Sequence, residues 1–477
     1  MAQLEFNDFA GLADSIFRGI KGSFYKLVGL DIHSVPGSIT VHQKLAKNSG
    51  STVTEFCRYS VSCSTGWQIW FSYTSGKIWA RSSAGAWTLA YTTTPAAGNA
   101  GCLGAEEYNG NVYFATQSRL HYIAVANVDG DWTGSVTEDF GTFSKTDSEF
   151  HPMRVANAKL FIGDGNIVAS VDSSNTFTAS ALDLEEPSRI KCIENYDIDI
   201  LLGTIITNTV NYCSVVRWDT VQTSWQYEDH IDENGVNAFF KIGNTVVAQC
   251  GTSGNIYYYD GTNFQEFKRI PGTWTPTRYG EVYPDAVGVL RGISVFGFSN
   301  SPDAANSTGN PADQGVYSLG HYSKDYPIVL TGPDWIISQD LVASIEIGSI
   351  LVEGHDMYVS WKDGSNFGVD KIDYSNKYAS AYLETPAITP NTYDESTFPR
   401  FFANYQSLPA SCSLTFSYKV NHGSYVALTT VDDVKKFQLY ADGAPDGRVV
   451  QLKVQFTVSS NSAPVVESIG VELAQFK

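Results

Sequence analysis

One pattern of strand and turn recurs roughly every 40–50 residues over most of this chain. In residues 254–270, GNIYYYDGTNFQEFKRI, an aromatic-rich strand is followed by an Asp-Gly turn and then by an aromatic residue. Six further segments have the same plan: residues 76–91, 119–135, 166–180, 214–228, 315–330 and 369–384. The aromatic residues that follow the turns are Trp87, Trp132, Phe177, Trp225, Phe264, Tyr326 and Tyr378. We expect these seven side chains to be structural and to lie in the core of the repeats.

A shorter and more apolar strand precedes each of these segments, as in WQIWFS (67–72) and NVYFAT (111–116). A four-stranded unit cannot bury both of its faces alone, so such units stack around an axis and share apolar side chains with their neighbours. Repeats of this length that contain only strands and turns are typical of β-propeller blades. The sequence therefore predicts an all-β fold with a β-propeller of about seven blades over residues 51–385.

Two segments depart from the repeat. The polar stretch 300–315 lengthens the sixth interval between aromatic positions, and we expect it to be an insertion at the edge of a blade. A propeller also needs a strand that closes its ring. Residues 37–46, GSITVHQKLA, follow the turn VPG and are the candidate closing strand. Residues 1–50 are accordingly predicted to be an N-terminal strap that ends in this strand.

The repeat ends near residue 385, and residues 386–477 contain shorter strands of alternating apolar and polar residues, such as SLTFSYKV. Alternation of this kind predicts a small C-terminal β-sandwich. This segment has eight acidic and seven basic residues, whereas the whole chain has a formal charge of −19. Nearly all of the negative charge therefore belongs to the first 385 residues.

The composition excludes several classes of protein. A charge of −19 argues against a surface that grips nucleic acid phosphates specifically. The first residues, MAQLEFNDFAGL, lack the apolar region of a secretory signal, and no apolar run reaches the roughly 20 residues of a membrane helix. The seven cysteines contain no CxxC pair, which favours buried free thiols in a reducing compartment. We expect a protein that does not bind membranes and that folds in a cytoplasm.

Candidate catalytic groups are sparse, and the sequence does not predict an enzyme. Four acidic pairs occur: Glu106/Glu107, Glu185/Glu186, Asp197/Asp199 and Asp232/Glu233. A glycosidase needs two carboxylates at a set separation across a sugar, which adjacency in the sequence does not supply. Asp197 and Asp199 share a strand face and could matter at a propeller axis, but solvated charges are the simpler interpretation. The turns SSAGAWT (82–88) and DGTNF (260–264) are incomplete versions of the Asp-box of sialidases.

Metal and cofactor motifs are also missing, so no cofactor and no metal are predicted. The eight histidines have no HExxH or other metal-ligand spacing, and each is expected to be a surface or hydrogen-bonded residue. HIDENGVN (230–237) resembles part of a calcium loop but lacks the later bidentate acid.

The order of these elements resembles virion proteins of tailed bacterial viruses. The resemblance is carried by the N-terminal run 19–51, by the repeats at 105–123, 256–267 and 314–330, and by the closing stretch 405–424. It implies a structural protein of the phage tail, of the nozzle type, in which propellers surround the path of exiting DNA. The implied partners are other virion tail proteins and further copies in a homo-oligomeric ring, with a host-surface glycan as a possible contact of the sandwich. An acidic propeller would not retain passing DNA, because like charges repel.

Two other functions stay open at this stage. A carbohydrate-binding or glycosidase-like propeller could use exposed aromatic residues such as Trp70 and Trp79 as platforms for sugar rings. A cytoplasmic scaffold of the tryptophan–aspartate-repeat type is the third interpretation, although RWDT (217–220) is a single occurrence of its signature.

Overall fold

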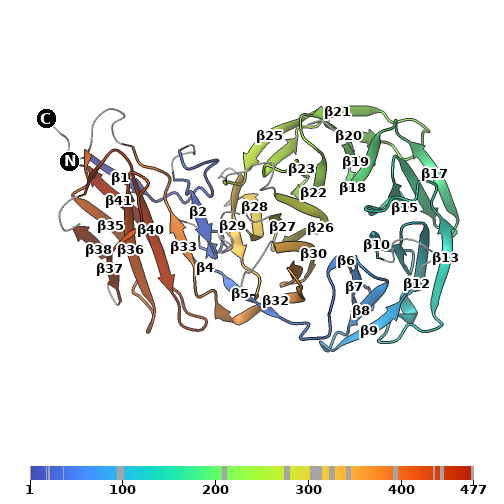
Figure 1. Ribbon diagram of the computed structural model, residues 1–477, viewed down its shortest axis with the longest axis horizontal. Helices are drawn as coiled ribbons and strands as arrows, with labels where there is room; N and C mark the ends of the chain where they lie inside the picture. The colour runs from blue at the N-terminus through green and yellow to red at the C-terminus, as the bar shows by residue number, and fades with distance from the viewer. Residues whose placement is uncertain are drawn as a thin grey trace.

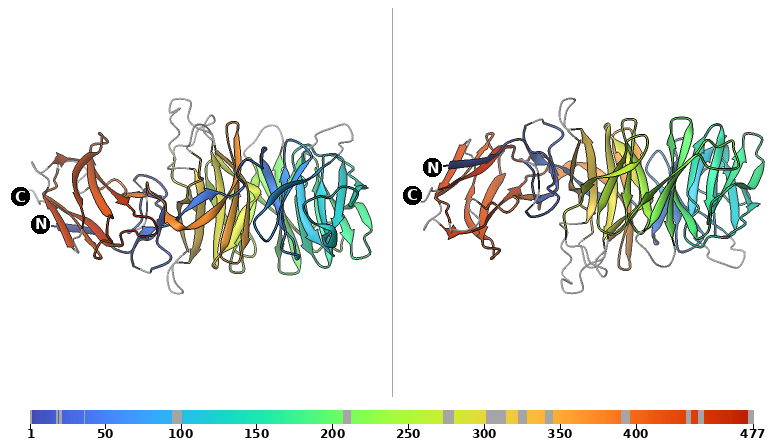
Figure 2. Two further views of the ribbon diagram at one scale, coloured as in Figure 1. Left: turned by 90° about the horizontal axis from the view of Figure 1, so that it is seen from below. Right: turned by 90° about the horizontal axis from the view of Figure 1, so that it is seen from above.

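The computed structural model describes residues 2–17, 19, 22–35, 37–93, 101–206, 212–272, 280–300, 314–321, 328–339, 345–389, 396–432, 436–440 and 445–473. They form a ring of sheets with a smaller pair of sheets beside it (Figure 1). The smaller part lies against the rim of the ring and not over either end of its axis (Figure 2). Apart from a 3-10 turn at Val125–Asn127, every regular element of the described residues is a β-strand.

Five sheets of the ring are antiparallel meanders of four consecutive strands. The first contains β6 (Cys57–Ser62), β7 (Gln68–Ser72), β8 (Lys77–Arg81) and β9 (Trp87–Thr92). The second contains β10 (Gly104–Tyr108), β11 (Asn111–Ala115), β12 (Arg119–Ala124) and β13 (Val136–Thr142). The third contains β14 (Met153–Ala156), β15 (Lys159–Asp164), β16 (Ile167–Asp172) and β17 (Phe177–Asp183). The fourth contains β18 (Ser188–Tyr196), β19 (Asp199–Ile206), β20 (Cys213–Trp218) and β21 (Tyr227–Ile231). The fifth contains β22 (Val236–Ile242), β23 (Thr245–Cys250), β24 (Asn255–Tyr259) and β25 (Phe264–Arg269).

The remaining ring strands form one eight-stranded sheet. Its first set is β26 (Gly280–Leu290), β27 (Ile293–Asn300), β28 (Gly315–His321) and β29 (Ile328–Trp335). Its second set is β30 (Ile345–Glu353), β31 (Asp356–Asp363), β32 (Asn366–Lys377) and β5 (Gln43–Lys47). A single pairing, Asn300 with Ile345, connects the two sets. The candidate closing segment 37–46 includes most of β5, which lies antiparallel to β32 although more than 300 residues separate them.

The predicted all-β propeller is confirmed. In each set the first strand is nearest the axis and the fourth is on the rim (Figure 1). The apolar strands that precede the repeats are the second strands, and β7, for example, has every residue buried. Both faces of such a strand are covered by neighbouring sheets, which is why its residues form a continuous apolar run instead of alternating.

The turn from third to fourth strand has a recurring chemical basis. Asp172, Asp219 and Asp260 each begin such a turn, and each carboxylate accepts hydrogen bonds from backbone N–H groups farther along it. Aspartate is favoured at this position because its short side chain can replace a backbone acceptor. The repeated aspartates are therefore turn residues.

Two sheets make up the smaller part. One has the order β1 (Ala2–Phe6), β41 (Val466–Leu473), β35 (Arg400–Tyr405) and β38 (Lys436–Tyr440). The other has the order β2 (Lys26–Val28), β33 (Tyr382–Glu384), β40 (Val450–Thr457), β36 (Ser413–Val420) and β37 (Val426–Val431). Two short pairs accompany them, β3 (Leu30–Asp31) with β4 (Thr40–Val41) and β34 (Ser396–Thr397) with β39 (Asp446–Gly447). The N-terminal segment thus contributes a strand to each of the two sheets before it enters the ring as β5.

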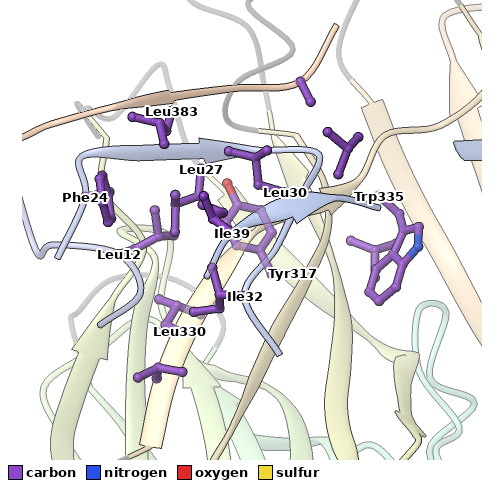
Figure 3. Close-up of a cluster of buried hydrophobic side chains, with 14 of the residues drawn as sticks. Leu12, Phe24, Leu27, Leu30, Ile32, Ile39, Tyr317, Leu330, Trp335 and Leu383 are labelled. Carbon is purple, nitrogen blue, oxygen red and sulfur yellow. The ribbon is translucent and has the colours of Figure 1, made fainter. Parts of the chain in front are cut away.

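The N-terminal segment connects the ring to the smaller sheets through a common apolar core (Figure 3). Its side chains Leu12, Phe24, Leu27, Leu30, Ile32 and Ile39 are buried between Leu330 and Tyr317 of the ring and Leu383 of β33. Main-chain hydrogen bonds fix the position of the segment, for example from the N–H of Leu12 to the carbonyl of Leu330 at 2.7 Å. Each buried side chain of this size contributes about 1.5–3 kcal/mol through removal from water.

Candidate functional site at the propeller axis

Irregular pairing of the first strands leaves polar residues unpaired at the axis. Between β6 and β7 the register shifts after Cys57, between β18 and β19 after Ile190, and between β22 and β23 after Val236. The residues left without a cross-strand partner are Arg58, Lys191 and Asn237. A longer shift in β26 leaves Tyr283–Ala286 unpaired. β-bulges of this kind change the direction of side chains and are frequent at functional sites.

These residues form a network of ion pairs and hydrogen bonds. The ammonium of Lys191 lies 2.7 Å from Oδ1 of Asn237 and 3.1 Å from Oε2 of Glu281. The Tyr283 hydroxyl accepts a hydrogen bond from Arg58 at 3.1 Å and donates to Oε2 of Glu346 at 2.8 Å. Burial raises the pKa of Glu281, but the charges of Lys191 and Arg58 and the hydrogen bonds from Lys191 and Tyr283 together outweigh it, and the net shift is downward. The carboxylate is thus held ionised beside its lysine.

A second group of charges surrounds a small cavity on the same axis. Glu194 pairs with Arg154 at 2.6 Å and with Lys241 at 3.1 Å. The cavity, of about 50 Å³, is lined by first-strand residues that include Glu106 and Asp285. Burial raises the pKa of Asp285 to about 7, although the backbone N–H of Ser60 donates to its carboxylate at 2.8 Å. Burial also raises the pKa of Glu106. Two acids whose pKa values are raised by burial therefore face one small space.

The volume and the charge limit what this site can do. Ligand sites for small molecules usually measure about 300–1,000 Å³, so the axial cavity has room for a few water molecules only. Five basic side chains face five acidic ones, namely Arg58, Arg154, Lys191, Lys241 and Lys362 against Glu106, Glu194, Glu281, Asp285 and Glu346. With all ten groups charged, the axis carries no net formal charge.

Of the seven aromatic positions singled out in the repeat, six lie in the described residues. Trp132 and Phe264 are buried, and the partly buried Trp87, Phe177, Trp225 and Tyr378 pack against apolar clusters of the sheets. Tyr326 and most of the insertion 300–315 lie outside the described residues. Trp70 and Trp79, considered as sugar platforms, are fully buried and cannot stack on a ligand.

The acidic pairs of the sequence are separated by the fold. Glu106 faces the axial cavity, whereas Glu107 accepts hydrogen bonds from the backbone and hydroxyl of Ser64. Asp199 does not reach the axis, because it is the first residue of a second strand and pairs with Arg217 at 2.6 Å. Glu186 pairs with Lys145, and Glu233 accepts from Asn255. These carboxylates serve local ion pairs and turns.

Sequence reasoning missed Arg58, Lys191 and Asp285. Their signal is a charged residue inside a strand, as in CRYSVS and SRIKCIENY. A charged residue in a strand can also lie at a solvated strand edge. The β-bulge is what places these side chains at the axis instead.

A larger cleft lies where the closing strand meets the smaller sheets. Its volume is about 570 Å³, and its lining includes Leu45 and Ile336 together with Gln339, Tyr378 and Ser460. Lys44 and Lys377 also line it, but Lys44 lies 3.7 Å from Asp373 and Lys377 donates to the carbonyl of Val41 at 2.6 Å. The cleft therefore offers mainly hydroxyl and amide groups over an apolar floor.

Other chemical groups of the described residues are inert or dispersed. All seven cysteines are buried free thiols, as predicted. No three His, Cys, Asp or Glu side chains within the described ranges are placed so that they could hold a metal ion. A search of those ranges for a helix long and apolar enough to span a membrane finds none.

Comparisons with known proteins show no family for this chain. No family model matches the chain, and no curated protein matches its sequence. Among solved structures, the extracellular domain of the putative hybrid two-component system BT4673 from B. thetaiotaomicron is 13% identical with a TM-score of 0.45, covering 84% of this chain and 47% of that one. Virginiamycin B lyase from Staphylococcus aureus is 11% identical with a TM-score of 0.46, covering 69% of this chain and 97% of the lyase. At these values the likenesses carry no argument about activity.

Proposed function

We propose that this chain is a structural subunit of the tail of a phage particle, in a nozzle-type ring around the path of exiting DNA or at the surface that meets the host. The observation that carries the proposal is the division of charge between the two parts of the molecule. Residues 51–385 contain 38 acidic and 19 basic residues, which equals the whole formal charge of −19, whereas residues 386–477 are almost neutral.

This division suits a ring subunit. Acidic propellers repel one another and repel DNA, so contacts between copies are more favourable through the neutral sheets. Three of the rim strands, β13, β17 and β21, contain acidic residues and no Lys or Arg, whereas β25 and β5 are net basic. DNA in such a ring would pass between subunits and not along the axis of one propeller.

We further propose the finer architecture that this role requires. The five meanders and the two sets of the eight-stranded sheet correspond to seven blades, with β5 as the strand that closes the last one. The two smaller sheets form a sandwich, which the stacked rings of Phe401 and Tyr418 from opposite sheets support. The proposed boundaries are residues 51–385 for the propeller and 386–477 for the sandwich, except that β33 (Tyr382–Glu384) already pairs with the sandwich strand β40. Residues 1–50 form a strap, which contributes β1 to one sandwich sheet and β2 to the other.

The experiment is immunogold electron microscopy of purified particles from the source culture, with an antibody against residues 386–477. Gold at a single vertex or along the tail supports a virion subunit. Particles that carry no label, with the antigen free in the medium or on cells, contradict it. Non-immune antibody on the same grids measures background.

The cleft of about 570 Å³ favours a second candidate, binding of a neutral glycan. Hydroxyl and amide side chains over an apolar floor suit a neutral sugar. The two cations of the cleft, Lys44 and Lys377, already have partners, so an anionic ligand is not required. A glycan array with the whole protein and a Gln339→Ala variant tests this function. Binding that the variant loses supports the cleft, whereas no binding to any glycan, or equal binding by the variant, contradicts it.

A further inference from the structure

A small pocket lined by both polar and apolar side chains lies where the N-terminal segment meets the ring. Its volume is about 60 Å³, and its walls include Asp31, His33 and His42 from the segment and Ser318 and Trp335 from the ring. Three buried side-chain atoms here have no hydrogen-bond partner: Nδ1 of His33, Nε2 of His42 and Oδ1 of Asp334. Unsatisfied buried polar atoms are costly, so their presence at one seam calls for a functional explanation.

The geometry argues against a hydrolytic triad. The hydroxyl of Ser318 lies 3.3 Å from Nε2 of His33, but it also donates a hydrogen bond to the carboxyl of Asp334. In a serine triad the acid orients the histidine and leaves the serine free to attack. Here the acid is bonded to the serine, and Nδ1 of His33 has no partner.

Asp334 lies behind this pocket, where the lining residue Ser318 donates a hydrogen bond to it, and it is the group at the seam that is least able to carry a charge. Its side chain is completely buried, and the hydroxyl of Thr331 donates to Oδ2 at 2.8 Å. The nearest possible cation, Nε2 of His42, lies 4.0 Å from Oδ2. Within the described residues, no Lys or Arg forms an ion pair with this carboxyl.

The other titratable groups at the seam oppose its ionisation or are engaged elsewhere. Asp31 faces Asp334, its charge would repel a second carboxylate, and it lies 3.8 Å from Nδ1 of His42. Lys377 donates to the carbonyl of Val41, and Arg291 lines the pocket. The ring of His42 lies against Trp335, with centroids 4.3 Å apart.

We propose that this pocket is a proton-operated latch: the N-terminal segment stays docked on β28 and β29 while Asp334 carries a proton, and it is released when Asp334 ionises. The latch is independent of the virion function proposed above.

The direction of the pH effect follows from the pKa shifts of Asp334 in the ring and of His42 in the N-terminal segment. Burial raises the pKa of Asp334 to about 8, from about 3.9 for a free aspartate, so docking weakens as pH rises towards 8 and is weakest above it. Burial lowers the pKa of His42 to about 4, although Asp31 opposes this, so docking also weakens as pH falls from 6.5 towards 4. Burial also lowers the pKa of His33, so both histidines oppose the effect of Asp334 below about pH 6.5. Above pH 6.5 the two histidines are neutral whether the segment is docked or released. Asp334 then sets the pH dependence, and release becomes about tenfold more favourable per pH unit up to pH 8.

Release would act on the ring itself. His42 is followed immediately by the closing strand β5, whose first pairing joins Gln43 to Lys377. A segment that leaves β28 and β29 therefore frees the beginning of the strand that closes the ring.

Hydrogen exchange measured by mass spectrometry on the whole protein, between pH 6 and 9 and corrected for intrinsic rates, tests the latch. We expect peptides from residues 26–43 and from β29 to lose protection by about tenfold per pH unit between pH 6.5 and 8. The Asp334→Asn variant, which keeps the acceptor for Thr331 and cannot ionise, should lose this dependence. Asp285→Asn is the matched control, because it removes another buried acid of raised pKa far from the seam, and it should keep the dependence.

Protection of residues 26–43 that does not change with pH in the wild-type protein overturns the proposal. A slope that survives in Asp334→Asn, or disappears in Asp285→Asn, also overturns it. If Asp334→Asn does not fold, a second measurement replaces that variant. The emission spectrum of Trp335→Phe is subtracted from that of the wild type, which leaves the emission of Trp335. A red shift of the Trp335 emission with a midpoint near pH 8 supports the latch, and an unchanged emission contradicts it.

Discussion

The propeller axis and the junction with the smaller sheets are both buried, but they are built by different means. At the axis, charged side chains meet partners of opposite charge, such as Lys191 with Glu281 at 3.1 Å. At the junction, apolar side chains such as Phe24 and Leu30 supply the contact, and the few polar atoms of Asp334 and His42 remain incompletely paired. Apolar burial thus holds the junction together, whereas the axis requires every charge to keep its partner.

A cavity in the apolar junction should cause the largest loss of stability. Replacement of Phe24 by Ala removes a completely buried ring that stacks on Phe9, and we expect it to cost about 3–5 kcal/mol of unfolding free energy. Denaturant unfolding measures this loss. Phe17→Ala is the control, because that side chain is 64% exposed and its removal should change stability little. Equal effects of the two substitutions would contradict the assignment of the junction core.

An unpaired charge at the axis should have the next largest effect. Lys191→Met leaves the carboxylate of Glu281 and the amide of Asn237 without their cation, at an expected cost of about 3–5 kcal/mol. The double variant Lys191→Met/Glu281→Gln should recover part of that loss, since no lone charge remains. A double-mutant cycle on unfolding free energies measures the coupling. Strictly additive effects would show that the ion pair is not coupled.

The axis also predicts a pH effect of its own. Because the pKa of Asp285 is raised to about 7 in the folded protein, its contribution to stability is greatest below pH 4 and is lost as pH rises towards 7. Asp285→Asn should flatten this part of the stability profile, and the variant should gain roughly 2–4 kcal/mol relative to the wild type between pH 4 and pH 8. Thermal unfolding of both proteins between pH 4 and pH 8 measures this gain. Parallel curves of stability against pH would exclude the raised pKa of Asp285.

The smallest expected effect lies on the surface. Asp219 accepts hydrogen bonds from the backbone N–H groups of Val221 and Gln222, both at 2.9 Å, in an exposed turn. Asp219→Ala should lower the denaturation midpoint by less than any substitution above, and Asp219→Asn, which keeps the acceptor, by less still. A larger loss for Asn than for Ala would contradict the turn assignment.

The repeat predicted the propeller because its cause is local. A turn that begins with Asp172 or Asp260 and an apolar second strand can both be recognised in a short window of sequence. The axial network cannot be recognised in this way. Lys191 and Glu281 are 90 residues apart, and their contact depends on bulges whose positions no local pattern reveals. The pocket between Asp31 and Ser318, with Asp334 behind it, was missed for the same reason, since it joins segments that are distant in the sequence.

The pairing of β1 with β41 affects the order in which the molecule can be completed during synthesis. Ala2 pairs with Leu473, and Gln43 of the closing strand pairs with Lys377. A ribosome therefore releases the partners of the first strands only when nearly the whole chain has been translated, and until then β1 and β5 have open edges. We infer that a chain truncated within the last sheet would leave β1 unpaired, exposed to pairing with other chains and to proteases.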